Sequence, residues 1–271
     1  IKCYYNLIMK ILILGRTSFL SREFSKFLKK KNISYSVKGL SSFLALDKKK
    51  IEKFDSLINF CVHKNYLHMR YNKKYDLDLK IIKKIREIKI KFVMLSSAKV
   101  YSADVNLLES SQKKPKSNYG KNKLVTEKGI SKSIKNFIIF RLSNIMSQKI
   151  IKSKTSVTNT FFDIVRANFL QKKIIFPQQK TYKDFIFVDD FCKLLLLSLK
   201  KNLKGTYNLS SGKKTYLKKL ALILSKITNF KISFIDSKTD SFILNNNKLI
   251  KKLKYKKKIK EVNLINLKKI L

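Results

Sequence analysis

The sequence contains few of the residues from which disulfide frameworks and metal sites are built. Among its 271 residues there are three cysteines, two histidines and no tryptophan. Cys3, Cys61 and Cys192 are an odd number without a Cys-x-x-Cys pair, so we expect neither a disulfide framework nor a zinc site. His63 and His68 belong to no cluster of histidines and cysteines, and no metal is expected.

Long apolar runs are also missing. None reaches the ~18–20 residues that a membrane-spanning helix needs, so we expect no membrane span and a soluble, cytoplasmic protein. Residues 1–8 precede Met9, which reads as a native start. We therefore interpret them as an upstream extension rather than a signal peptide, because no cleavage-type region follows them.

Acidic residues are scarce beside basic ones. The chain has 62 Lys+Arg, only six of them Arg, against 17 Asp+Glu, a formal charge of +45. Nucleic-acid-binding proteins usually rely on Arg, which contacts phosphate and guanine with two hydrogen bonds. Here lysines occur in every segment, mostly on the polar faces of periodic stretches, as in chains from AT-rich genomes. With 44% hydrophobic residues the chain is no disordered polyelectrolyte, and we predict no specific nucleic-acid partner.

The order of apolar segments predicts an α/β fold. Short apolar runs alternate with amphipathic helical stretches, which indicates a parallel sheet flanked by helices. Strands are expected at 11–14, 33–37, 56–62, 91–96 and 137–140, and helices at 19–31, 73–88 and 118–133. Beyond residue 141 the alternation is looser. Strands are expected at 174–176 and 184–188, a strand plus turn at 205–212, helices at 161–169, 190–199 and 216–227, and a small surface helix within 245–271.

The first predicted strand runs into a turn that could bind phosphate. Glycines at three-residue steps let such a turn close over a pyrophosphate at a helix N-terminus. Here Gly15 holds the first position, while Ser18 and Ser21 replace the other two glycines. Both a degenerate phosphate loop and a plain strand–turn–helix remain open on this motif alone.

A second set of residues favours proton-transfer chemistry. Tyr119 and Lys123 are four residues apart and share a helix face. An ammonium ~4 Å from a phenol, at an effective dielectric near ~20, is worth about 4 kcal/mol, enough to bring the pKa of a tyrosine from ~10 toward neutrality. Such a tyrosine can exchange a proton with a carbinol or carbonyl, with Ser97 as a second hydrogen-bond anchor. Tyr-x-x-x-Lys alone is common in a lysine-rich chain, but here it follows a strand-end Ser-Ser and a Val-Tyr, with a proline four residues before Tyr119.

Six motifs in this order resemble the extended short-chain dehydrogenase/reductases, specifically the NAD-dependent epimerase/dehydratase family that acts on nucleotide sugars. They are the loop at Gly15, Ser96-Ser97-Ala-Lys-Val-Tyr101, Tyr119-x-x-x-Lys123, Arg141-Leu-Ser-Asn144, Lys183-Asp184-Phe185-Ile-Phe-Val188-Asp189-Asp190 and Gly205-Thr-Tyr-Asn-Leu-Ser-Ser-Gly212. The resemblance implies a Rossmann-type doubly wound parallel sheet with a small C-terminal α/β substrate-binding subdomain. It assigns residues 9–145, with 184–200 returning, to the NAD(P)-binding domain, and 146–271 to the substrate-binding portion.

The resemblance also implies the site. Its catalytic residues would be Ser97, Tyr119 and Lys123; its cofactor residues Gly15, Ser18, Phe19, Leu20, Lys38, His63, Tyr119 and Lys123; and its substrate residues Asn144 and Lys183. The cofactor would be NAD or NADP, since Lys38 stands where an acidic residue would bind the ribose 2′-hydroxyl and could face a 2′-phosphate or be a surface lysine. His63 could touch the cofactor or cap the strand before it. A homodimer through helices 73–88 and 118–133 is implied by resemblance only.

The substrate implied is a nucleotide sugar, a polyanion that a positively charged protein attracts. Family dehydratases carry an Asp-Glu pair where this chain has Ala98-Lys99, so we expect a 4-epimerase or a 4-ketoreductase rather than a 4,6-dehydratase. The alternative is a weakly catalytic or non-catalytic dinucleotide-binding protein, because the two replaced glycines could weaken pyrophosphate binding.

Overall fold

Short apolar runs pair in parallel to form the central sheet of the computed structural model, which describes residues 9–147, 173–177, 181–229, 231–235 and 240–269. The strands lie in the order β10-β5-β4-β3-β1-β2. Their bounds are β1 Lys10–Leu14, β2 Ser34–Lys38, β3 Ser56–Asn59, β4 Lys91–Ser97, β5 Phe137–Leu142 and β10 Gly205–Leu209. The chain winds in both directions from β1, which pairs with β2 on one side and β3 on the other. Ligands of such sheets bind at the carboxyl ends of the strands near this reversal.

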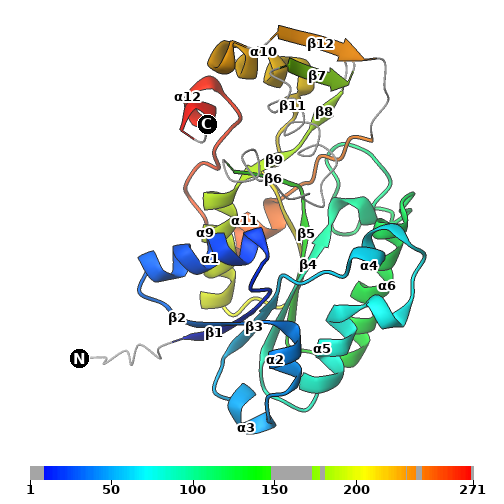
Figure 1. The fold of residues 1–271 in the computed structure, drawn as a ribbon, viewed down its shortest axis with the longest axis vertical. Coiled ribbons are helices and arrows are strands. Elements are labelled where there is room, and N and C mark those ends of the chain that lie inside the picture. Colours follow the sequence, from blue (N-terminus) through cyan, green and yellow to red (C-terminus); the bar gives the residue numbers. More distant parts are fainter. Residues whose placement is uncertain (1–8, 148–172, 178–180, 230, 236–239, 270–271) are drawn as a thin grey trace.

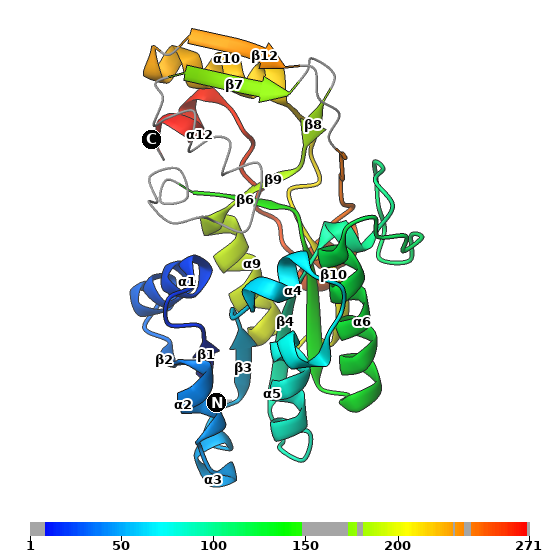
Figure 2. The same cartoon turned by 45° about the vertical axis from the view of Figure 1, so that its right-hand side comes forward.

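Helices cover both faces of the sheet (Figure 2). One face carries α1 (Phe19–Lys30), α9 (Val188–Lys200) and α11 (Asn247–Leu253); the other carries α2 (Leu40–Leu44), α3 (Lys48–Ile51), α5 (Leu77–Ile85) and α6 (Asn118–Ser133). Alternate residues of β1 divide between the two cores: Ile11 and Ile13 pack toward α1, Leu12 and Leu14 toward α5. The doubly wound α/β fold predicted from the sequence is therefore confirmed.

Most predicted elements of this half appear within a few residues, and two differ for visible reasons. The strand expected at 56–62 ends at Asn59, whose side chain accepts the N–H of Cys61 at 2.8 Å and turns the chain away from the sheet. The chain then forms the short helix α4 (Lys64–His68). The helix expected at 73–88 is a 3₁₀ turn, η1 (Lys73–Tyr75), followed by α5, because Asp76 caps the latter.

A second group of elements lies beyond the carboxyl ends of the strands (Figure 1). Three small strand pairs occur there: β6 (Asn144–Met146) with β9 (Phe185–Phe187), β8 (Tyr182–Lys183) with β11 (Thr215–Tyr216), and β7 (Lys173–Pro177) with β12 (Lys231–Ile235). Helices α10 (Leu217–Thr228) and α12 (Leu264–Lys268) complete this group. The helix expected at 161–169 lies outside the described residues, and the sheet also takes its strand β10 from beyond the 184–200 segment.

The described helices include none that is both long and apolar enough to cross a membrane.

Candidate active site

Ser97 is the last residue of β4 and stands at the carboxyl edge of the sheet. Its hydroxyl oxygen accepts the backbone N–H of Lys99 at 3.2 Å and so caps a 3₁₀ turn, η2 (Ala98–Val100). This capping bond uses the oxygen as an acceptor and leaves the hydroxyl proton for another partner. Ser97 is thus fixed at the strand end with a donor to offer.

Helix α6 carries Tyr119 and Lys123 one turn apart on a shared face. The residue between them that packs most tightly is Gly120: a Cβ there would overlap the carbonyl oxygen of Lys99 and lie 2.9 Å from its carbonyl carbon. Since η2 follows Ser97 directly, this close approach brings the first turn of α6 against the strand end that holds Ser97.

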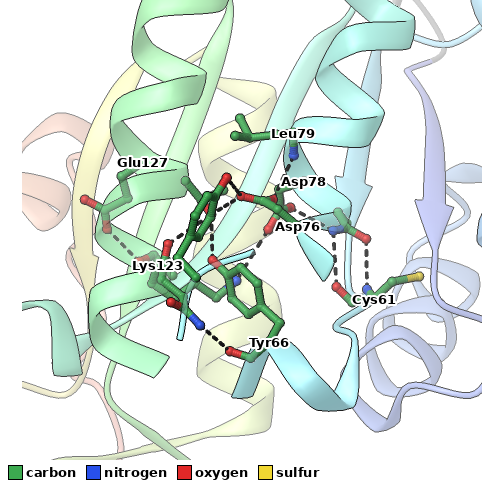
Figure 3. A network of polar contacts seen from close by, with 12 residues as sticks. Cys61, Tyr66, Asp76, Asp78, Leu79, Lys123 and Glu127 are labelled. Atoms are coloured by element: carbon green, nitrogen blue, oxygen red, sulfur yellow. Dashed lines mark hydrogen bonds and ion pairs between the residues drawn. The ribbon is translucent and has the colours of Figure 1, made fainter. Parts of the chain in front are cut away.

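Lys123 is buried beside the carboxylate of Asp78 and near the ring of Tyr66 (Figure 3). Its Nζ lies 3.4 Å from Oδ2 of Asp78, 5.4 Å from the centroid of the Tyr66 ring and 5.9 Å from that of the Tyr119 ring. Burial alone lowers the pKa of Lys123, but the Asp78 carboxylate and the neighbouring tyrosines outweigh burial, so the pKa is raised above its usual value. Lys123 therefore presents a charged ammonium beneath Tyr119.

The ring of Tyr66 packs edge to face on the ring of Tyr119, with 6.5 Å between the ring centroids. Its hydroxyl lies 2.6 Å from Oγ1 of Thr126, which donates to Oδ2 of Asp76 at 2.6 Å. Because the threonine proton goes to Asp76, the Tyr66 hydroxyl is the donor to Thr126. Burial also raises the pKa of Tyr66, so this tyrosine is a neutral structural group.

Gly15 supplies the close backbone approach that a dinucleotide loop needs. Its φ is +116°, which L side chains rarely adopt, and a Cβ would lie 3.2 Å from the backbone of Phe60 and 3.3 Å from Cβ of Ser18. Its N–H donates to the carbonyl of Lys38 at 3.0 Å, which places this turn beside the end of β2. The first glycine position of the predicted loop thus fits a pyrophosphate.

The two serines in the later glycine positions differ in their surroundings. Ser18 is the N-cap of α1 but makes no capping bond with its side chain, and the first turn of α1 has no acidic residue, which suits an anion. Ser21 is 1% exposed, and its hydroxyl has no hydrogen-bond partner within the described residues. Ser18 therefore fits a phosphate contact, whereas Ser21 is a packing residue with an unsatisfied hydroxyl.

Four more residues are expected at the cofactor from the sequence. Phe19 and Leu20, in the first turn of α1, pack against the hydrophobic cores on either side of it. Lys38 ends β2, and no carboxylate occurs between it and the end of α2. His63 caps α4: its Nδ1 accepts the N–H of Asn65 at 3.2 Å, and its ring stacks on Tyr75 at 4.6 Å.

The expected substrate residues lie on two of the small strand pairs: Asn144 begins β6, and Lys183 ends β8. The side-chain amide of Asn144 donates to the carbonyl of Asp184 at 3.0 Å, and the ammonium of Lys183 donates to the carbonyl of Asp240. Burial and the neighbouring charge of Lys99 lower the pKa of Lys183 to about 8. A polyanion bound beside Lys183 would relieve this repulsion.

Two buried acids that matter here were not expected from the sequence. Asp184 is fully buried and accepts four donors: the N–H and hydroxyl of Ser211 and the N–H groups of Gly212 and Leu244. Burial raises its pKa to about 6. Asp78 is the other, and a signal for it existed: it lies three, four and seven residues before Ile81, Ile82 and Ile85, on the buried face of α5.

Several motif residues build a buried network under the site. Arg141 pairs with Glu127 at 2.6 Å and donates to the hydroxyl of Tyr101 at 2.8 Å. Tyr101 donates to Oδ1 of Asn208 at 2.8 Å, and Ser96 to Glu127 at 2.6 Å. The arginine and asparagine of the predicted motifs thus tie β4, β5, β10 and α6 together.

The model of the family described as "NAD dependent epimerase/dehydratase family" matches residues 11–210. The chain belongs to the NAD-dependent epimerase/dehydratase family. The resemblance read from the six motifs is confirmed, and with it the dependence of the family on a nicotinamide cofactor. No curated protein matches the sequence.

Solved structures of similar fold include three nucleotide-sugar enzymes. A UDP-N-acetylglucosamine 4-epimerase from Methanobrevibacter ruminantium, in complex with UDP-N-acetylmuramic acid, is 15% identical with a TM-score of 0.75 over 97% of this chain and 95% of that one. A dTDP-glucose 4,6-dehydratase from Bacillus anthracis in complex with NAD is 14% identical, with a TM-score of 0.75 and the same coverage. A dTDP-4-dehydrorhamnose reductase from Clostridium acetobutylicum is 17% identical, with a TM-score of 0.72 over 97% and 98%. At these identities the likeness shows a shared fold.

In this member of the NAD-dependent epimerase/dehydratase family, Ser97 and Gly15 lie at the carboxyl ends of β4 and β1, and helix α6, which carries Tyr119 and Lys123, packs on the turn that follows Ser97. In the part of the chain that the structure describes, no three histidine, cysteine or acidic side chains are grouped so as to hold a metal ion.

Proposed function

We propose that the protein is an NAD(P)-dependent epimerase or reductase of nucleotide sugars, of the 4-epimerase or 4-ketoreductase type, with Ser97, Tyr119 and Lys123 as catalytic residues. The observation that carries this proposal is the packing of Gly120 on Lys99, which joins the first turn of α6 to the end of β4. This packing supports a site in which the serine, tyrosine and lysine act together at the carboxyl ends of the strands, where ligands of such sheets bind.

In this proposal each residue has one task. Tyr119 exchanges a proton with the sugar hydroxyl or keto oxygen, with the Lys123 ammonium near its ring. Ser97 donates its hydroxyl proton to the same oxygen. The nicotinamide, when bound, supplies or takes up the hydride at the sugar carbon. Lys123 also holds the cofactor's ribose, as the family resemblance implies.

The surrounding residues support both ligands. The turn at Gly15 and Ser18 would hold the pyrophosphate of the cofactor, and Lys38, with no carboxylate nearby after β2, favours a 2′-phosphate and hence NADP. Asn144 and Lys183 would contact the diphosphate of the sugar nucleotide. Ala98-Lys99 offers no acid/base pair for elimination, which favours epimerisation or reduction over dehydration.

The test is turnover of UDP-, dTDP-, GDP- and CDP-sugars and their keto forms by the wild-type protein and Tyr119→Phe. Loss of the phenolic proton donor is expected to lower kcat by about 10²–10⁴-fold, while the dissociation constants of NADH and NADPH change little. Tyr35→Phe, in β2 away from the site, is the matched control. Product analysis then separates the two reaction types, because a reductase consumes one NAD(P)H per product and an epimerase consumes none.

Equal turnover by wild type and Tyr119→Phe would exclude the catalytic role of this tyrosine. Calorimetry with NADH and NADPH addresses the alternative of a non-catalytic protein: if neither binds, the replaced glycines have abolished cofactor binding. Ser18→Gly combined with Ser21→Gly should then restore it. A lower dissociation constant for NADPH than for NADH, lost in Lys38→Ser, would support NADP as the cofactor.

A further inference from the structure

The candidate catalytic lysine forms a buried ion pair with an acid outside the proposed set of catalytic residues. Nζ of Lys123 lies 3.4 Å from Oδ2 of Asp78, and the two side chains are 5% and 6% exposed. A buried ion pair carries a large desolvation cost, so its presence calls for a specific reason. In a chain with 17 acidic residues against 62 basic ones, a carboxylate placed inside the protein beside one lysine is a selective arrangement.

The second oxygen of Asp78 is fixed from the sheet. Nδ2 of Asn59, the last residue of β3, donates to Oδ1 of Asp78 at 2.7 Å. Asn59 is itself held by the backbone of Cys61, whose N–H it accepts at 2.8 Å (Figure 3). With Oδ1 engaged by Asn59, Oδ2 is left to face Lys123. The carboxylate is therefore oriented by the sheet edge, not by the lysine alone.

The groups around Lys123 come from three elements. Tyr66 of α4 and Tyr119 of α6 present their rings, Asp78 belongs to α5, and Asp76 caps α5. Asp76 is engaged elsewhere: its Oδ1 accepts the N–H of Leu79 at 3.0 Å and its Oδ2 accepts Thr126 at 2.6 Å. Within the described residues, Asp78 is accordingly the acid that forms an ion pair with Lys123.

The same molecule shows a buried lysine without a carboxylate. Nζ of Lys91 donates to Oδ1 of Asn136 at 2.9 Å and to the carbonyl of Leu203 at 2.8 Å, both neutral acceptors. Burial, with a smaller effect of Lys204, lowers the pKa of Lys91 to about 8. Lys123 is as deeply buried, yet its pKa is raised, and the Asp78 carboxylate is the largest cause that opposes burial.

We propose that Asp78 is the positioning residue of Lys123, which holds the ammonium beneath Tyr119 and keeps it charged inside the protein. Without this carboxylate Lys123 would resemble Lys91 and lose its proton within the working range of an enzyme. The inference deepens the proposed function, since a neutral lysine could neither present a positive charge to Tyr119 nor remain a charged partner for the cofactor's ribose.

The test compares Asp78→Asn with Asp76→Asn, two isosteric changes at neighbouring buried acids. Urea-unfolding midpoints are measured from pH 7 to pH 10 without cofactor or substrate. In Asp78→Asn the folded-state pKa of Lys123 falls below its unfolded value, so the folded state binds fewer protons and gains stability as the pH rises through this range. We expect its midpoint to lie below that of the wild type at pH 7 and to approach it by pH 10. For Asp76→Asn the difference in unfolding midpoint from the wild type should vary little between pH 7 and pH 10.

Two further readouts follow. The value of kcat/KM for Asp78→Asn should fall about tenfold for each pH unit above the new pKa of Lys123, while Asp78→Glu, which keeps the charge, should recover part of the lost activity at pH 9. The dissociation constant of NADH or NADPH, followed by nicotinamide fluorescence, should rise over the same pH range in Asp78→Asn only.

A midpoint difference between wild type and Asp78→Asn that stays constant from pH 7 to pH 10 would overturn the proposal and leave Asp78 as a structural acid. If Asp78→Asn does not fold, Asp78→Asn combined with Lys123→Met should fold, because it buries no unpaired charge, and failure of this double variant would equally overturn it. The unfolding measurement needs no turnover, so it remains decisive even if no sugar nucleotide proves to be a substrate.

Discussion

Strand β4 runs from the side of the sheet where the parallel strands begin (the amino edge) to the side where they end (the carboxyl edge). A buried lysine lies near each of these two edges. At the amino edge Lys91 begins the strand and donates to two neutral oxygens, those of Asn136 and Leu203. At the carboxyl edge, where β4 ends at Ser97, Lys123 contacts the carboxylate of Asp78. These two lysines are the ones that are buried among the described residues.

The two lysines differ in the charge of their partners, and this difference changes their pKa in opposite directions. Neutral acceptors satisfy the hydrogen bonds of an ammonium but do not compensate its charge, so burial lowers the pKa of Lys91 to about 8. A carboxylate compensates the charge, and the pKa of Lys123 is raised. At the amino edge the lysine only has to join three segments. In the site that we propose at the carboxyl edge, a positive charge faces Tyr119, and Asp78 is the acid beside that charge.

Replacing each lysine with methionine should give the largest difference in activity and stability between the two edges. Lys123→Met is expected to lower kcat/KM by about 10²–10⁴-fold and to destabilise the protein by about 3–5 kcal/mol, because Asp78 is left buried without a partner. Lys91→Met removes hydrogen bonds but also the cost of a buried charge, so activity should be unchanged and stability at pH 7 should change by only about 1 kcal/mol. Urea unfolding and steady-state kinetics measure both.

Comparable losses of activity in the two variants would break the comparison, because the amino edge would then contribute to catalysis. A stable Lys123→Met would show that Asp78 does not need its partner.

The two glycines of α6 offer a second contrast between the edges. At Gly120 a Cβ would meet the backbone of Lys99, whereas at Gly129 it would lie 2.8 Å from a terminal methyl carbon of Leu79, which can move aside. Gly120→Ala should therefore destabilise the protein by about 1–3 kcal/mol and lower kcat/KM, since Tyr119 is displaced from Ser97. For Gly129→Ala the helix propensity of alanine, worth about 1 kcal/mol, should offset the shift of Leu79.

Thermal unfolding and kcat/KM of both alanine variants decide this point. A Gly120→Ala variant as active and stable as Gly129→Ala would mean that α6 does not need to approach η2 closely, and the geometric support for the proposed site would be lost.

The fold was largely predictable because the spacing of apolar residues along the sequence indicates which faces of helices and strands are buried. Helix α6 has the predicted bounds of 118–133. Alternate residues of β1 pack into the cores on the two faces of the sheet, as expected for a parallel sheet that is covered on both sides. Strand β3 ended earlier than its apolar run suggests because a side chain, Asn59, bonds to the chain two residues on. Such local bonds compete with the sheet and leave no trace in hydrophobic periodicity.

The site was predictable only where a motif spans a short stretch. Tyr119 and Lys123 lie on one helix, so their spacing alone places them together. The pair of Lys123 with Asp78 crosses 45 residues of sequence and depends on how α5 packs against α6. Asp184 likewise meets its donors 27 to 60 residues away. A single sequence gives no register between separate elements, and for this reason the buried acids were missed.

The smallest expected effect concerns the pH dependence of the amino edge. The folded-state pKa of Lys91 lies at about 8, below the ~10.5 of an unfolded lysine. The folded state therefore binds fewer protons, its stability is reduced throughout below pH 8, and it recovers as the pH rises from 8 toward 10.5. The free energy of unfolding of the wild type minus that of Lys91→Met should therefore increase between these two pH values. Urea unfolding at pH 7, 8.5 and 10 measures it, with Lys89→Met, at an exposed lysine two residues earlier, as the control.

The direction of this change makes it informative. Lys123 in the wild type should contribute the opposite trend, since a raised pKa gives stability that is present below pH 10.5 and lost above it. The difference in free energy of unfolding between wild type and Lys91→Met could instead stay constant or fall as the pH rises. The neutral acceptors would then compensate the charge of Lys91 to the same degree as Asp78 compensates that of Lys123. The two edges would then not differ in electrostatics, and a carboxylate beside Lys123 would need another explanation than the charge of a catalytic lysine.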